Sequence, residues 1–466
     1  MTLDADQGRA VSERLTLGGR MRERAAEHRG QARVAYRLAD RYAGHLLHVA
    51  GVGWHHWDGT RWRYDDTGAA QRAVLDELRR ALRESLDDKE LRADVRKCES
   101  SAGVAGVLYL AAALEPFTAR VADLDADPYL LNCANGTLDL RTLELRAHRP
   151  SDRITKICRA AYDPDAQSEL WGRFLARVLP DPDVCGFVQR LVGVGLLGEV
   201  REHVLPILTG VGANGKSVLD KAIRYVLGDY ALAAEPELFM HREGAHPTGE
   251  MDLRGVRWAV VSETDRGRRL AEATMKRLTG GDTIRARRMR QDFVEFNPSH
   301  TALLISNHLP KVSGDDPAVW RRLRVVPFGV VIPEAERDPE LDSRLQLEAD
   351  GILAWAVAGH RAYLDSGLAE PASVRAATDS YQADSDAVRR FITEVCVTTS
   401  PALKATTGQL HDAYEKWRAI DGAEPLSLKA FGAALDRHGY PAGPPSNGKR
   451  WRTGIAVQAT DTSDDQ

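Results

Sequence analysis

The chain has 466 residues, a formal net charge of −4, 43% hydrophobic residues and 28% charged residues. This length indicates about three or four folding units, and no apolar run reaches the roughly 18 residues that a membrane-spanning helix needs. The balanced charge excludes a global attraction to nucleic acid, so any such binding must depend on locally concentrated lysine and arginine.

The first residues are polar and lack the apolar core of a secretory signal. The five cysteines are widely spaced and form no CxxC pair, which argues against a disulfide framework and against a zinc site. We therefore expect a cytoplasmic protein. Residues 1–34 are expected to form a mobile leader, and residues 459–466 a disordered acidic tail.

Residues 35–195 are expected to form an α-rich N-terminal accessory domain. Helical periodicity runs through residues 36–47, 170–179 and 184–197, and the alternation in residues 136–149 predicts a β-hairpin.

Two clusters in this region have alternative interpretations. Trp54, Trp57 and Trp62 indicate the core of a small hairpin subdomain. The alternative is that these rings stack on nucleic-acid bases. Three aspartates could mimic a metal-binding carboxylate set, although a loop before Pro128 is favoured; they are Asp123, Asp125 and Asp127.

Residues 196–335 have the pattern of an α/β domain with an open sheet. Short apolar runs at 204–209, 257–261 and 301–306 are separated by helical and polar segments, as the buried strands of such a sheet are. Because ligands of open α/β sheets bind at the carboxyl ends of the strands, the site is expected where these runs end.

The segment GVGANGKSV contains the phosphate-loop pattern GxxxxGK[ST] between a predicted strand and a predicted helix at 216–228. Glycines let backbone N–H groups turn toward phosphates, and the helix N-terminus adds its positive end. Lys216 is predicted to reach the terminal phosphates of a nucleotide, and Ser217 to hold Mg²⁺. The predicted nucleotide-binding residues are Gly210, Val211, Gly212, Ala213, Asn214, Gly215, Lys216, Ser217 and Val218.

Two further runs end in polar residues that suit phosphate chemistry. After the second run, Glu263 could organise magnesium or polarise water; a solvated glutamate is the alternative, and Asp265 is the reserve candidate. After the third run, the amide of Asn307 could orient water beside a γ-phosphate, and a simple turn former is the alternative.

Arginines are concentrated on both sides of Asn307. Arg321 or Arg322 could neutralise the transferred phosphoryl group of a neighbouring subunit as an arginine finger. Alternating arginines on a hairpin that points into a channel would contact phosphates, and a solvated face is the alternative. The arginines of this stretch are Arg285, Arg287, Arg288 and Arg290.

Residues 336–395 are expected to form a helical extension of the ATPase domain. Residues 396–458 have the pattern of two helices and a hairpin, which predicts a winged-helix-like domain with a candidate recognition helix at 427–438. The basic residues of this domain could contact the backbone of duplex DNA; the alternative is that the domain binds a protein partner. These residues are Lys429, Arg437, Lys449, Arg450 and Arg452.

The segments GVGANGKS, VVSETD, KRLTGGDTIRAR, LLISNHLP and AVWRRLRVVPF occur in this order. Together they resemble the superfamily 3 helicase domain of phage and plasmid primase-helicases, including the poxvirus-type proteins. The likeness extends upstream through WHHWDGTRWRYDD and YLLNCANGTLDLRTLELRAH, and downstream through GILAWAVAGHRAYLDSGL. It covers nearly the whole chain from about residue 35.

The resemblance implies an α/β, AAA+ type P-loop ATPase in a ring-forming hexamer that uses ATP and Mg²⁺ and translocates 3′ to 5′ on single-stranded DNA. It implies a Walker A pair (Lys216 and Ser217), a Walker B acid (Glu263), a sensor (Asn307) and an arginine finger (Arg321 or Arg322). The resemblance also implies a DNA-contacting hairpin, and the residues that fall in its region are Lys276, Arg285, Arg287, Arg288 and Arg290. Ser262 stands where many P-loop ATPases have an aspartate, which leaves open whether Glu263 serves the metal, the water or both.

Longer members of the family carry a polymerase-type primase domain for which the upstream region is too short. We therefore expect a helicase without its own primase domain, acting on single-stranded and forked DNA during replication of a phage, plasmid or mobile element. A separate primase or replication initiator is a further expected partner. The alternatives are an NTP-dependent DNA-binding assembly that remodels partners without unwinding, and a P-loop phosphotransferase.

Overall fold

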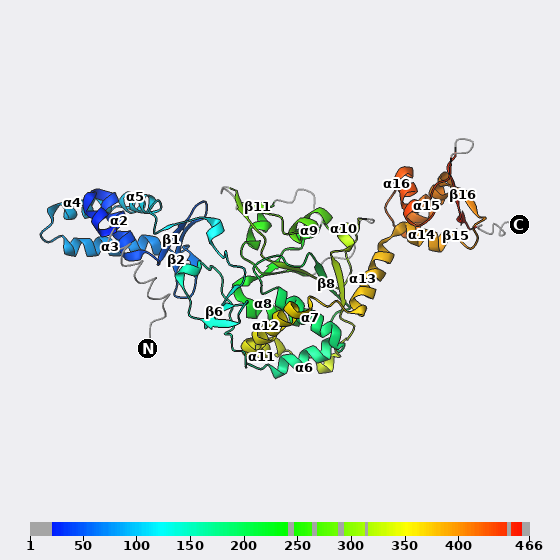
Figure 1. Cartoon of the computed structure of the whole chain (residues 1–466), viewed down its shortest axis with the longest axis horizontal. Helices are drawn as coiled ribbons and strands as arrows, with labels where there is room; N and C mark the ends of the chain where they lie inside the picture. Colours follow the sequence, from blue (N-terminus) through cyan, green and yellow to red (C-terminus); the bar gives the residue numbers. More distant parts are fainter. Residues whose placement is uncertain are drawn as a thin grey trace.

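The structure is a computed structural model that describes residues 21–240, 247–262, 268–287, 293–312, 316–444 and 449–458. An α-rich N-terminal unit, a central α/β domain and a small C-terminal unit follow one another along the long axis of the molecule (Figure 1). In the described part of the chain, no helix is both long and apolar enough to cross a membrane.

The N-terminal unit packs helices α2 to α5 against a small sheet. Helix α2 lies at its centre, with Val34 and Leu38 completely buried on the side that meets the other helices. The helices are α2 (Gly30–Tyr42), α3 (Ala69–Glu84), α4 (Lys89–Cys98) and α5 (Ser101–Ala111). The sheet has the order β3-β2-β1-β4, with β1 (Leu46–Val49), β2 (Gly53–Trp57), β3 (Trp62–Tyr64) and β4 (Thr118–Ala119).

Residues 21–34 belong to this folded unit, so the expectation that the leader reaches residue 34 was wrong. Residues 21–27 are helical, and Met21 and Ala25 are buried one helical turn apart. The apolar residues of this short stretch are too few to reveal an amphipathic helix.

The tryptophans form part of the hairpin core, which confirms the favoured interpretation. Trp62 is 3% exposed and lies across the β2–β3 pair from Trp57, with ring centroids 5.8 Å apart. Trp54 packs edge-on against Phe117.

The aspartates near residue 125 bind protein groups separately. Asp123 and Asp127 form ion pairs with arginines, and Asp125 accepts hydrogen bonds from the backbone N–H and the hydroxyl of Thr155. Across the described ranges, no three His, Cys, Asp or Glu side chains are grouped as metal ligands would be. The loop interpretation therefore agrees with the structure.

A three-stranded antiparallel sheet joins the N-terminal unit to the central domain. β5 (Leu130–Cys133), β6 (Gly136–Asp139) and β7 (Glu144–Arg146) pair in that order, which confirms the predicted hairpin and adds one strand to it. The backbone N–H of Asn132 donates to the buried hydroxyl of Tyr230, and Arg257 donates to the carbonyl of Leu130. These bonds fix β5 to the central domain.

The central domain contains a parallel sheet with the strand order β14-β8-β13-β10-β9. Alternate side chains of a strand point to opposite faces, so in β10 Trp258 and Val260 enter one core while Ala259 and Val261 enter the other. The runs are continuously apolar because both faces are covered. The strands are β8 (Leu205–Thr209), β9 (Ala231–Ala234), β10 (Trp258–Ser262), β13 (Thr301–Ser306) and β14 (Leu323–Pro327).

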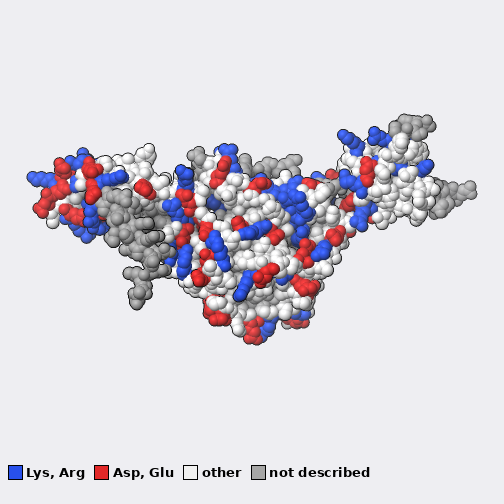
Figure 2. Space-filling model, in the orientation of Figure 1, with Lys and Arg blue, Asp and Glu red and all other residues white. Residues whose placement is uncertain are grey.

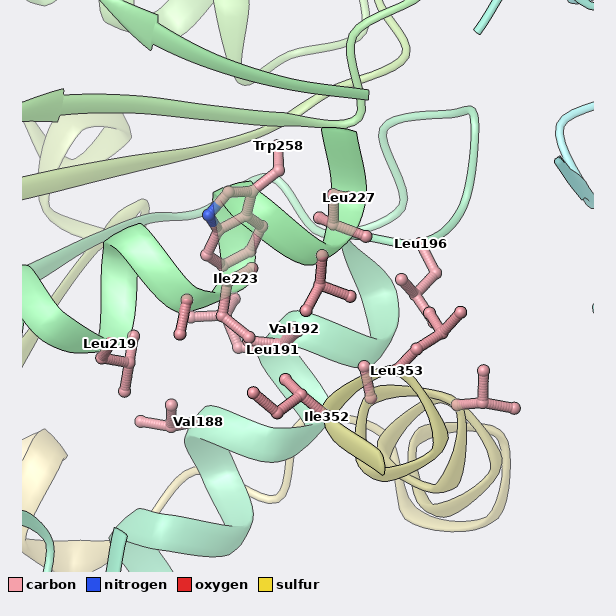
Figure 3. Close-up of a cluster of buried hydrophobic side chains, with 14 of the residues drawn as sticks. Val188, Leu191, Val192, Leu196, Leu219, Ile223, Leu227, Trp258, Ile352 and Leu353 are labelled. Carbon is pink, nitrogen blue, oxygen red and sulfur yellow. The ribbon is translucent and has the colours of Figure 1, made fainter. Parts of the chain in front are cut away.

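In the described chain, five helices cover one face of this sheet, and one of them, α8, follows the phosphate loop. Figure 3 shows Ile223 of α8 beneath Trp258, with Val192 of α7 and Ile352 of α12 below it. The helices are α6 (Glu169–Val178), α7 (Pro182–Val194), α8 (Lys216–Leu227), α11 (Leu341–Leu347) and α12 (Ala349–Ser366). Because α6 and α7 bury their apolar faces here, the expected boundary between residues 195 and 196 does not separate two compact units.

The other face of the sheet carries the smaller elements of the central domain. They are α9 (Glu272–Leu278), the antiparallel pair β11 (Ile284–Ala286) and β12 (Val294–Phe296), α10 (Pro317–Trp320) and α13 (Ala372–Ser385). α9, α10 and β11 lie above the sheet in Figure 1, and with α13 they share a second apolar core that includes Met275, Ile284, Trp320 and Tyr381.

The C-terminal unit packs three helices around Phe391, Tyr414 and Phe431. They are α14 (Ala387–Val395), α15 (Thr407–Asp421) and α16 (Leu428–Arg437). Phe391 lies on α14, so this unit begins before residue 396, where the sequence suggested a boundary.

The prediction of a hairpin at the end of the C-terminal unit was wrong. The two strands in that segment do not pair with each other; each pairs with an earlier strand of the unit. β17 (Trp451–Thr453) pairs with β16 (Lys404–Thr406), and β18 (Ala456–Val457) pairs with β15 (Cys396–Val397). Both pairs are antiparallel.

Candidate functional site

A cavity of about 500 Å³ lies where β8 and β13 end, and we call it the phosphate-loop cavity. It is enclosed by the loop after β8, the first turn of α8 and the residues after β13. Its lining residues are Gly212, Ala213, Asn214, Gly215, Lys216, Ser217, Val218, Ile305, Ser306, Asn307 and His308. The structure therefore brings the predicted phosphate loop and Asn307 to one site.

The loop backbone has a conformation that depends on particular residues. Gly215 has φ of 89°, and a Cβ atom there would lie 2.5 Å from a methyl carbon of Val178. Ala213 also has a positive φ, 59°, which is uncommon for a residue with a side chain and is often found at ligand sites. Buried Asn214 donates to the carbonyl of Phe328 at 3.2 Å and fixes the loop to the end of β14.

Lys216 is the central cation of the cavity and is only 4% exposed. Its ammonium donates to the carbonyl of Gly210 at 2.7 Å, to Oδ1 of Asn214 at 3.0 Å and to Oδ1 of Asn307 at 3.2 Å. Burial lowers the pKa of Lys216, since desolvation disfavours the charged form. A partly desolvated ammonium at the N-terminus of a helix attracts an anion strongly.

The strand order explains why Asn307 reaches Lys216. β13 lies between β8 and β10, so the residue after β13 lies between the phosphate loop and the end of β10. That end is Ser262; Glu263 and Asp265 follow it and lie outside the described residues. The side chains of Asn307 and Ser217 are exposed at the cavity, where a ligand can meet them.

The two candidate finger residues differ in exposure. Arg322 is 8% exposed and donates to the carbonyl of Ala318 at 2.8 Å, so its guanidinium stays within its own turn. Arg321, directly after α10, is exposed. Arg321 is therefore the member of the pair that can reach another molecule.

The predicted DNA-contacting residues divide into three groups. Lys276 on α9 forms an ion pair of 2.7 Å with Asp316, so its charge is compensated. Arg285 and Arg287 are exposed on the face of the β11–β12 pair that points away from the core. Arg288 and Arg290 lie outside the described residues. Figure 2 shows further basic side chains gathered over α9 and α10.

The basic residues of the C-terminal unit are also divided by burial. Lys429, Lys449 and Arg450 line a cavity of about 770 Å³ beside the first turn of α15 and one side of α16. Arg437 is exposed. Arg452 is 2% exposed and donates to Asp436 at 2.6 Å and to the carbonyl of Gly432 at 2.9 Å. Since its guanidinium is used inside the unit, Arg452 is not available to contact a nucleic acid.

Two residues near the hairpin were not among the residues predicted from the sequence. Asp316 accepts the N–H of Ala318 and caps α10, and an aspartate directly before Pro317 is a recognisable helix-start signal. Phe293 is 46% exposed beside the hairpin arginines. Its alternation with buried Val294 could have placed it on the outer face.

Comparisons with known families identify two segments of the chain. Residues 35–180 match a family described as D5 N terminal like, and residues 208–322 match a family of unknown function, DUF5906.

Similar proteins come from large DNA viruses. "Putative helicase L207/L206" of Acanthamoeba polyphaga mimivirus is 28% identical over 320 residues, covering 64% of this chain and 33% of the relative. "Putative helicase 121R" of Invertebrate iridescent virus 3 is 29% identical over 232 residues, covering 47% of this chain and 24% of the relative. A "Putative primase" of African swine fever virus is 24% identical over 323 residues, covering 63% and 34%. The chain thus spans about a third or less of the length of these relatives.

Among solved structures, two apo forms of the C-terminal region of NrS-1 are similar to this chain. One has a TM-score of 0.47 at 11% identity and covers 88% of this chain and 96% of that one. The other has a TM-score of 0.46 at 13% identity and covers 89% and 96%.

Proposed function

Because this chain fits a primase-helicase family of the D5 type, we propose that it is an ATP-dependent DNA helicase of superfamily 3. The observation that carries the proposal is the buried ammonium of Lys216, 3.2 Å from Oδ1 of Asn307 in the phosphate-loop cavity. Helix N-termini attract phosphates, and open α/β sheets bind ligands at the carboxyl ends of their strands. Both conditions are met at this lysine.

The residues of the cavity fit a nucleoside triphosphate with Mg²⁺. Lys216 and the backbone N–H groups of the loop would hold the phosphates, and the hydroxyl of exposed Ser217 would be a ligand for the metal. Glu263, one residue beyond the end of β10, is proposed to serve the metal or the attacking water. The bound nucleotide would supply the free energy of hydrolysis.

We propose that the ATPase domain is of the AAA+ type and that Arg321 completes the site of a neighbouring protomer. Its exposure beside α10 supports this role, because a finger must leave its own subunit. The proposal includes a hexameric ring, translocation from 3′ to 5′, and a role in replication of a phage, plasmid or mobile element. It also includes a separate primase or replication initiator as a partner.

The hairpin formed by β11 and β12 is proposed to contact single-stranded DNA through Arg285 and Arg287. Both side chains lie on its exposed face. The C-terminal unit is proposed to be winged-helix-like and to contact duplex backbone through the exposed cations of its cavity; these are Lys429, Lys449 and Arg450.

The proposal is tested with purified full-length chain, radiolabelled ATP and a forked duplex. We expect ATP hydrolysis that single-stranded DNA stimulates, separation of the fork, and loss of both in Lys216→Ala. DNA-stimulated hydrolysis retained in Lys216→Ala would reject the assigned site.

Two other outcomes would favour the alternatives. Rings that hydrolyse ATP but leave the fork intact would indicate a remodelling assembly. Transfer of the γ-phosphate to a small molecule, without any effect of DNA, would indicate a phosphotransferase. Negative-stain images with an ATP analogue and forked DNA would show whether a ring encloses a strand.

A further inference from the structure

The exposed face of the β11–β12 hairpin carries an aromatic ring close to two arginines. The Cζ atom of Arg285 lies 4.8 Å from the ring centroid of Phe293, and the Cζ atom of Arg287 lies 4.7 Å from it. The ring is 46% exposed. A large apolar ring is therefore exposed on the outer face of the hairpin with two cations beside it.

The pairing of the two strands determines this arrangement. Ile284 and Ala286 of β11 and Val294 and Phe296 of β12 are buried in the core below. The alternate positions must point outward, since successive side chains of a strand lie on opposite faces. The outward positions in the described part of the hairpin are Arg285, Arg287, Phe293 and Glu295.

The charges on this face are held in a fixed pattern. Arg285 is directly opposite Glu295 in the register, and its Nε lies 3.7 Å from the carboxylate. Arg287 lies two residues further along the chain, and its Cζ atom is also close to the ring of Phe293. The outer face thus places one apolar ring beside two cations, a combination that could meet both a base and a phosphate.

We propose that Phe293 is a stacking platform for one nucleobase of single-stranded DNA. The inference rests on the proposed function and extends it to a base contact that the arginines cannot provide. Cation–π contacts at exposed sites are weak, so a base can replace a guanidinium at the ring. The displaced guanidinium then meets the adjacent phosphate, and binding tolerates any sequence because every base has a π-face.

The test compares a strand with bases to a strand without them. Fluorescence anisotropy of full-length chain would measure binding to dye-labelled oligo(dT) and to an abasic deoxyribose-phosphate strand of the same length. We expect Phe293→Leu to weaken oligo(dT) binding about tenfold, the loss of one stacked base, and to leave abasic binding within about twofold. Phe293→Trp should retain oligo(dT) binding, because its larger ring also stacks.

Two control variants separate stacking from other effects. Tyr109→Leu removes an 81% exposed aromatic ring on α5, an element that contributes nothing to the outer face of the hairpin, and should leave binding to both strands unchanged. Arg287→Ala removes a charge and should weaken binding to both strands, since both carry phosphates. Thermal melting of Phe293→Leu should match the parent chain, because the exposed ring contributes little to the core.

Three results would overturn the inference. Unchanged oligo(dT) binding in Phe293→Leu would show that the ring meets no base. Equal losses on both strands would show that Phe293 only positions the arginines. A parent chain that binds neither strand would reject the proposed function as well, whereas the first two results leave the helicase proposal intact.

Discussion

The ammonium of Lys276 lies 2.7 Å from a carboxylate oxygen of Asp316, and this ion pair joins α9 to α10. The other carboxylate oxygen of Asp316 accepts the N–H of Ala318 and caps α10. The hydrogen bond from Lys276 is the main cause that lowers the pKa of the Asp316 carboxyl group. Arg321, the candidate arginine finger, follows α10 directly. The ion pair between Lys276 and Asp316 therefore connects α9, the helix before the hairpin, to the segment that carries Arg321.

We therefore predict that Lys276 positions α10 and does not bind phosphate. Lys276→Ala should lower DNA-stimulated ATP hydrolysis, and Asp316→Ala should lower it further because it also removes the N-cap of α10. The double variant should be no worse than Asp316→Ala alone, because the ion pair is already broken there. The salt dependence of single-strand binding gives an independent measurement. Its slope should stay unchanged in Lys276→Ala and fall by about 1 in Arg287→Ala. A reduced slope of the salt dependence in Lys276→Ala would show that this lysine contacts DNA phosphates after all.

Asn307 is predicted to act on the rate of hydrolysis more than on nucleotide affinity. Asn307→Ala removes one of three acceptors of the Lys216 ammonium, and the carbonyl of Gly210 and the amide of Asn214 remain. Binding should therefore change only a few-fold, while kcat should fall about 100-fold if the amide orients a reacting group. Titration with a fluorescent ATP analogue and steady-state kinetics separate the two effects. Equal losses in affinity and kcat would indicate a binding role.

The phosphate loop and the strands around it were predictable because their patterns are local. Gly215 and Lys216 belong to a short motif, and the run ending at Ser306 is continuously apolar because both faces of the sheet are covered. The short strand β9 was missed, since residues 231–234 are three alanines and one leucine without a clear strand pattern.

Long-range packing limited the prediction of domain boundaries and of individual roles. Whether α7 belongs to the N-terminal or the central unit depends on contacts of Val192 with α8 and α12, which lie outside its own pattern. Arg321 and Arg322 are adjacent and chemically identical in sequence, and only the turn after α10 buries one of them. The engagement of Arg452 by Asp436 likewise depends on the fold of the C-terminal unit.

The contact between α7 and α12 should be sensitive to a single methyl group. A Cβ atom on Gly193 would lie 2.1 Å from the backbone nitrogen of His360, so the two helices would have to separate. We expect Gly193→Ala to destabilise the central domain by about 1–3 kcal/mol, as overpacking of a core does. Urea denaturation followed by circular dichroism would measure the change.

Gly172→Ala on α6 is the matched control for that experiment. Its added Cβ atom would have no neighbour within 4 Å, so only helix propensity changes. This variant should be neutral or more stable by up to about 1 kcal/mol, because alanine favours a helix more than glycine does. Equal stability of both variants would show that the close approach of α7 and α12 can relax.

Buried histidines should make the fold sensitive to mild acid. His300 is 1% exposed, neither of its ring nitrogens has a hydrogen-bond partner among the described residues, and burial lowers its pKa to about 4. Near pH 5.5 the unfolded chain binds a proton at this side chain and the native chain does not, so acidification from about pH 6.5 toward 4 favours unfolding. The expected loss between pH 7.5 and 5.5 is about 1 kcal/mol for this histidine. His300→Leu should reduce that loss in urea denaturation at the two pH values; an identical loss in the variant would show that His300 takes up its proton without unfolding.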